Sequence, residues 1–66
     1  MKPCDENIQA VLELSKEMID HAIKGINERE DDDCAILYGI VLDSAYKIRT
    51  VAKAEKEKHI QKGWWE

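Results

Sequence analysis

The stretch CAILYGIVL, residues 34–42, is apolar at almost every position. It opens a longer helical pattern that continues to about residue 62. A helix that is apolar on all sides must be covered on more than one side, because water tolerates such a surface poorly. The segment that precedes this stretch provides one cover. The simplest second cover is another copy of the chain.

The chain has 66 residues, which permits one domain, and a domain of this size buries only about 60% of the surface that its unfolded chain exposes. So small a core is usually supplemented by disulfides, a metal or oligomerisation. The two cysteines, Cys4 and Cys34, form neither a disulfide framework nor a zinc-binding pattern. We therefore expect self-association, with both thiols reduced and packed as small apolar side chains.

A first amphipathic helix is predicted from about residue 4 to 28. Pro3 suits the first turn of a helix, and Asp5 and Glu6 suit the positive end of its dipole. Apolar residues then recur at steps of three and four, as expected for one buried helix face. These residues are Ile8, Val11, Leu12, Met18, Ile19, Ala22, Ile23 and Ile26.

The polar run EREDDD, residues 28–33, predicts a turn, which we place at residues 29–32. Its aspartates suit the N-cap and first turn of the next helix, where a carboxylate accepts free backbone N–H groups. That second helix is predicted from about residue 33 to 62, with Gly63 directly after its last turn. Its apolar seam consists of Cys34, Tyr38, Val41, Ala45, Ile48 and Ala52.

The predicted fold class is therefore all-α, an antiparallel two-helix hairpin that forms one domain over residues 1–66. A turn near residue 32 brings together positions whose numbers sum to about 64. Ile19 then faces Ala45, and Gly25 faces Gly39. Large residues meet small ones along much of the seam, as close packing requires.

One hairpin leaves part of its apolar surface uncovered, and exposed patches of that kind usually mark an interface. The residues concerned are Ile36, Leu37, Ile40 and Val51. We predict that they join two hairpins into a homodimeric four-helix bundle. The orientation of the hairpins stays open, since only an antiparallel dimer would bring Cys4 of one chain near Cys34 of the other.

Charge is divided unevenly along the chain. Residues 1–33 carry four basic and ten acidic side chains, whereas residues 34–65 carry six basic and three acidic ones. We expect the lysines of the second helix to pair with acids of the first. The net charge of −4 argues against non-specific binding to nucleic acid or a membrane surface. With no signal peptide pattern, and with no apolar run near the roughly 20 residues that span a bilayer, we expect a cytoplasmic location.

Two Glu-x-x-x-His pairs, Glu17 with His21 and Glu55 with His59, have a spacing that can place two ligands on one metal. They fall at different levels of the hairpin, so we interpret each as a carboxylate–imidazole contact on a solvated face. No serine has a base placed beside it, and the glycines are isolated. We expect no enzyme activity, no cofactor and no metal site.

A candidate basic face lies on the second half of the second helix and would contact phosphates of RNA or DNA. It consists of Lys47, Arg49, Lys53 and Lys56. In size and helix-loop-helix plan the chain resembles the Rop family of plasmid RNA-binding hairpins, which dimerise into four-helix bundles. The resemblance covers the architecture alone, and no binding residue is transferred from it. An RNA-binding regulator is therefore the alternative function.

Trp64 and Trp65 follow the second helix directly. They either fold back onto Met1, Pro3 and Ile60 as an apolar plug or stay exposed as an anchor for a protein partner. Our main interpretation is a small homodimeric hairpin of bacterial or phage type that acts as a protein-interaction or regulatory module. A third reading is a structural protein whose task is assembly alone.

Overall fold

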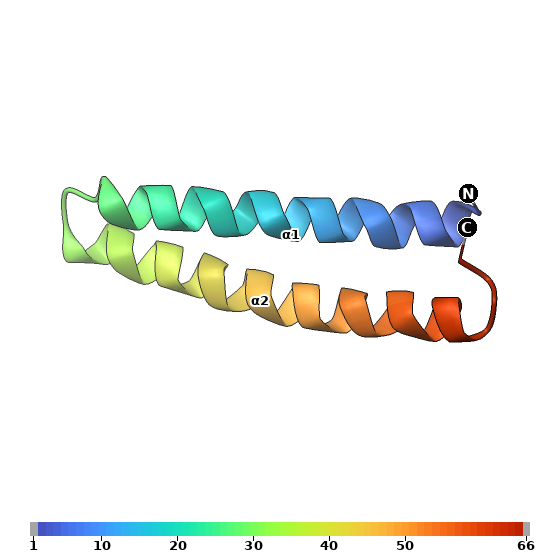
Figure 1. Ribbon diagram of the computed structural model, residues 1–66. Coiled ribbons are helices and arrows are strands. Elements are labelled where there is room, and N and C mark those ends of the chain that lie inside the picture. The colour runs from blue at the N-terminus through green and yellow to red at the C-terminus, as the bar shows by residue number, and fades with distance from the viewer. Residues whose placement is uncertain (1, 66) are drawn as a thin grey trace.

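The chain folds into an antiparallel pair of helices, shown as a ribbon in Figure 1. The structure is a computed structural model that describes residues 2–65. Helix α1 spans Pro3–Asn27 and helix α2 spans Asp32–Gln61, so each begins and ends within one residue of the sequence-based prediction. The all-α hairpin is therefore confirmed, and the Cα trace measures 48 × 16 × 13 Å.

Helix α1 begins at Pro3, because the φ angle of proline is already fixed at a helical value. Proline lacks a backbone N–H, but an N–H in the first turn would have no helical partner. The helix ends with a backbone N–H of Glu28 bonded to the carbonyl of Lys24 at 3.0 Å. Arg29 Nη1 donates to the carbonyl of Ile26 at 2.8 Å. These contacts satisfy carbonyl groups that the helix end leaves without helical partners.

Helix α2 begins with a side-chain cap. The Asp31 carboxylate accepts the backbone N–H of Cys34 at 2.8 Å, which confirms the capping role predicted for the aspartate run. This hydrogen bond holds the pKa of Asp31 below its ordinary value. Hydrogen bonding to the same carboxylate, with its negative charge, raises the pKa of the Cys34 thiol.

Helix α2 is terminated by Gly63, whose φ of 73° lies in the left-handed region that glycine adopts without strain. The Gly63 N–H bonds to the carbonyl of Ile60 at 3.0 Å, and the Trp64 N–H bonds to the carbonyl of His59 at 2.8 Å. This pair of bonds is the Schellman motif. It reverses the chain and fixes where the terminal tryptophans leave the helix.

The core between the helices is made mostly of small residues. The buried hydrophobic side chains are Ile19, Ala22, Ala45 and Ala52. Ser15 is also buried, and its hydroxyl donates to the carbonyl of Leu12 at 2.8 Å. Small residues allow the two helices to approach closely, but they contribute little apolar area, so the single hairpin has a weak core.

The predicted contact between Gly25 and Gly39 is wrong. A Cβ atom built on Gly25 would lie 2.6 Å from ring atoms of Tyr38, whereas one on Gly39 would have no atom within 4 Å. The predicted alignment, in which the numbers of facing positions sum to about 64, places residues at a common level. It does not specify which side of the helix they occupy. Tyr38 fills the seam beside Gly25, and Gly39 faces away from it.

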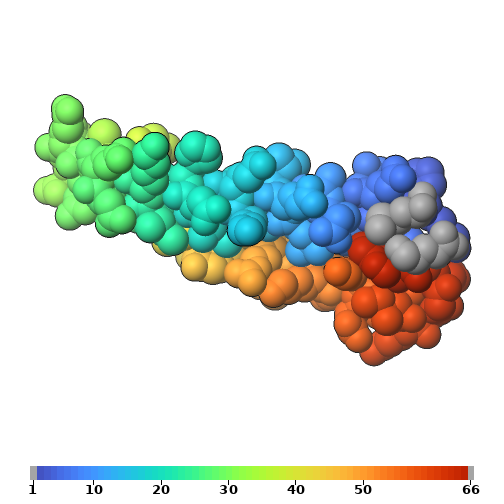
Figure 2. Space-filling view, turned by 45° about the horizontal axis from the view of Figure 1, so that its top comes forward, coloured from blue at the N-terminus to red at the C-terminus, as the bar shows by residue number. Residues whose placement is uncertain are grey.

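The molecule is a slender rod, as Figure 2 shows. The expected pairing of α2 lysines with α1 acids is also wrong: within residues 2–65, the ion pair that joins the helices is formed by Asp5 and His59. Lys58 pairs instead with Glu55 of its own helix at 3.3 Å. Neither helix in this part of the chain is long and apolar enough to cross a membrane.

Candidate interaction surface

One broad face of the hairpin exposes large apolar side chains from both helices, and we call it the apolar face. Its members are Val11 and Leu14 of α1 and Leu37, Ile40, Ile48 and Val51 of α2, each at least 38% exposed. The two members on α1 are three residues apart, and those on α2 follow at steps of three, eight and three. Such steps place side chains along one side of a helix that has 3.6 residues per turn.

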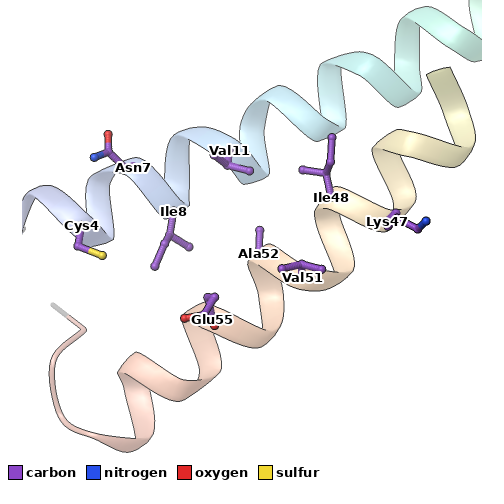
Figure 3. Close-up of a pocket in the computed structure, with 9 residues that line it drawn as sticks. All are labelled: Cys4, Asn7, Ile8, Val11, Lys47, Ile48, Val51, Ala52 and Glu55. Carbon is purple, nitrogen blue, oxygen red and sulfur yellow. The ribbon is translucent and has the colours of Figure 1, made fainter.

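An open groove of about 700 Å³ runs between the helices on this face. Figure 3 shows the side chains that line it, with Ile8 and Val11 coming from α1 and Ile48, Val51 and Ala52 from α2. Cys4 lies at one end of the groove and is exposed. A groove with a largely apolar lining offers a surface for another apolar chain.

The opposite face of the hairpin has a different character. A hollow there is lined by Gln9, Leu12, Glu13, Lys16, Ile19, Asp20, Arg49 and Lys53. Charged groups of both signs dominate this lining, and they remain well solvated at such a position. The hairpin is therefore two-sided, with one face suited to burial and the other suited to water.

The four predicted interface residues, Ile36, Leu37, Ile40 and Val51, are 55–63% exposed in the single chain. Three of them belong to the apolar face, and Ile36 lies at its outer edge by helical geometry. Their burial in a dimer stays a prediction. Sequence reasoning missed Val11, Leu14 and Ile48 as members of the same surface, because it assigned Val11 and Ile48 to the seam and gave no place to Leu14.

The predicted basic face is dispersed in the structure. Lys47 lines the edge of the apolar groove, and Arg49 and Lys53 line the charged hollow on the other side. Lys56 lies over the ring of Trp65, with its Nζ 4.9 Å from the ring centroid. Lys47 is thus separated from Arg49 and Lys53, and a role of these cations in nucleic-acid binding stays a prediction.

The open end of the hairpin holds a buried carboxylate–imidazole pair that sequence reasoning missed. His59 Nδ1 lies 2.7 Å from Asp5 Oδ1, and the two side chains are 12% and 1% exposed. An ionised carboxylate only accepts, so the imidazole nitrogen donates. The other Asp5 oxygen, Oδ2, is buried without a hydrogen-bond partner. The pair links the first turn of α1 to the last turn of α2.

The same end carries the two tryptophans, which pack against α2. The Trp64 ring meets the His59 ring edge to face at 5.5 Å, and Lys62 Nζ lies 4.5 Å from the Trp64 centroid. Trp64 remains 47% exposed, whereas Trp65 is partly buried. The predicted plug against Met1 falls on a residue outside the described range. In the described part of the chain, Trp64 packs on α2 and about half of it stays accessible.

The second Glu-x-x-x-His pair is not the solvated contact that we expected, because His59 turns toward Asp5 and Glu55 pairs with Lys58. His21 is exposed on α1. Within residues 2–65, no three potential ligands among the histidines, cysteines and carboxylates gather as a metal site would require. Both cysteines are free thiols, Cys34 being half-buried, so the expected burial of Cys4 is wrong for the single chain.

No protein-family model, curated protein or solved structure matches this chain. Functional inference therefore rests on the geometry of the apolar face and of the open end.

Proposed function

We propose that the chain is a non-enzymatic homodimeric hairpin, in which two apolar faces join to form a four-helix bundle, and that the dimer serves as a protein-interaction or regulatory module. The observation that carries this proposal is the apolar face itself. It gathers six large side chains on one side of the hairpin. Patches of that size on a small protein usually mark an interface.

The surface area of the chain supports a second copy as the partner. The chain exposes 4995 Å². A compact monomer of 7.6 kDa exposes about 4,300 Å² by the usual scaling with mass. The excess of about 700 Å² is close to the roughly 800 Å² that each partner buries in a standard interface. The core of the single hairpin is mainly alanine. Dimerisation would therefore supply stability that the seam between its two helices does not provide.

The regulatory part of the proposal rests on what a dimer would leave exposed. The charged faces would remain in water, and the open ends would present Trp64 on a fixed backbone turn. Tryptophan is the residue type most enriched at binding hot spots, and a rigid backbone reduces the entropy lost on binding. We therefore assign Trp64 and Trp65 as the anchor for a protein partner.

The dimer is tested by a pair of matched substitutions measured by sedimentation. Ile40→Gln places an amide on the apolar face, while Ile23→Gln makes the same change on an isoleucine that is 44% exposed on the other side of the hairpin. Glutamine is a good helix former, so neither change breaks the helix. We expect Ile40→Gln to weaken dimerisation at least tenfold and Ile23→Gln to leave it within about threefold. Equal effects would refute the apolar face as the interface.

A further inference from the structure

One row of residues along α2 has a spacing that reads the same in both directions. Leu37, Ile40, Ser44, Ile48 and Val51 follow one another at steps of three, four, four and three. The four apolar members are all exposed, and the small Ser44 at the centre lines a shallow hollow together with Ile40 and Val51. A symmetric row of this kind is complementary to a second copy of itself related by a two-fold axis.

We infer that the two α2 helices of the dimer lie antiparallel across a two-fold axis at Ser44, with the loops of the two hairpins at opposite ends. This inference rests on the proposed dimer and specifies its geometry. Leu37 then meets the partner's Val51, and Ile40 meets the partner's Ile48. Ser44 meets the partner's Ser44, where two small side chains let the helices approach closely at the crossing point.

The alternative arrangement, with both loops at the same end, leaves the row poorly matched. In that arrangement α2 faces α1 of the partner, at positions whose numbers sum to about 64. Ile48 and Val51 would then lie near the levels of the partner's Leu14 and the partner's Val11, whereas Leu37 and Ile40 would lie at levels where α1 has no member of the apolar face. Half of the row would lack an apolar partner, and apolar side chains gain most when they are buried against one another.

Charge at the edge of the interface is compatible with this arrangement. With the axis at Ser44, Asp43 comes near the partner's Lys47, and both residues line the hollow around Ser44. Exposed ion pairs of this type contribute little, so the apolar row decides the orientation.

The exposed thiol of Cys4 provides a direct test, since it lies near the open end of each hairpin. A nitroxide spin label is attached to Cys4 in a Cys34→Ala variant, and the distance between labels is measured by pulsed electron paramagnetic resonance. With the axis at Ser44, the two Cys4 positions lie 32 residues apart along the helix direction. At about 1.5 Å per residue, the separation is about 48 Å. With the loops together, the labels share one level and lie within about 25 Å.

A second measurement guards against disturbance by the label. In a Cys4→Ser, Cys34→Ala background, Ser44→Cys should oxidise readily to a disulfide-linked dimer. Lys53→Cys, at a residue that lines the charged hollow on the opposite face, should not. A long Cys4 distance with Ser44→Cys crosslinking supports the arrangement. A dimer with a short distance and no crosslink overturns the arrangement but leaves the proposed function intact. A chain that sediments as a folded monomer overturns both.

Discussion

The contact between Gly25 and the Tyr38 ring gives a sharp test of the hairpin packing. A methyl group at Gly25 would lie 2.6–2.7 Å from three ring atoms, whereas ordinary contacts begin at 3.4 Å. The ring would have to move by about 0.8 Å or swing away from the seam, and overpacking of this kind costs about 1–3 kcal/mol. Replacing a glycine inside a helix by alanine gains about 1 kcal/mol. Gly25→Ala should therefore range from neutral to about 2 kcal/mol destabilising.

Gly39→Ala is the matched control, because a Cβ atom there meets nothing within 4 Å. It should stabilise the chain by about 1 kcal/mol, the helix-propensity gain alone. The free energy of unfolding is measured by urea titration with circular dichroism, at one protein concentration for all variants, because dimerisation would make stability depend on concentration. The difference between the two variants isolates the clash, and we expect about 1–3 kcal/mol. If both variants stabilise equally, the Tyr38 ring does not pack on Gly25 and the described seam is wrong.

Three further predictions concern the helix ends. His59→Ala leaves the buried Asp5 carboxylate without its partner and should lower the free energy of unfolding, measured by urea titration, by about 1–3 kcal/mol. Adding Asp5→Ala to this variant should recover part of the loss, and no recovery would contradict the pair. Asp31→Asn removes the carboxylate whose hydrogen bonding and negative charge raise the pKa of the Cys34 thiol, so alkylation of that thiol at pH 8 should become faster; an unchanged rate would contradict the contact. Because the folded state holds the pKa of Asp31 below its ordinary value of about 3.9, the stabilisation by this carboxylate is present above that pH and is lost as the pH falls through the folded pKa. Thermal melts below about pH 4 should therefore converge between the wild type and Asp31→Asn, and parallel curves would contradict the shift.

The ends of the helices were predictable from the sequence because local chemistry fixes them. Pro3 starts α1, the Asp31 carboxylate caps α2, and Gly63 supplies the left-handed residue after the last turn. Each effect depends on residues within one turn of the chain. No knowledge of the partner helix was needed, and each boundary agrees within one residue.

The contacts between the helices were only partly predictable. A turn near residue 32 sets which levels meet, and residues 5 and 59 sum to 64, so the Asp5–His59 pair lay on the predicted alignment. It was missed because Asp5 was assigned to the helix dipole and His59 to a pair with Glu55. The alignment leaves helix rotation unspecified, which is why Gly39 was placed in the seam that Tyr38 occupies.

The apolar face was partly predictable for a related reason. The run at residues 34–42 is apolar on all sides, so it required a second chain in addition to α1. Its exposed residues mark the side on which that chain would pack. Periodicity within one helix cannot show that Val11 and Leu14 of α1 continue the same surface. That continuity depends on the antiparallel packing, which turns the corresponding flanks of both helices to one side of the hairpin.

The most direct test of this account is the mass of the folded chain in solution. Sedimentation equilibrium across the micromolar range, with helix content followed in parallel by circular dichroism, should give a particle of twice 7.6 kDa that loses helix as it dissociates on dilution. A fully helical chain that remains a monomer throughout this range would contradict the account, because the apolar face would then need no second copy.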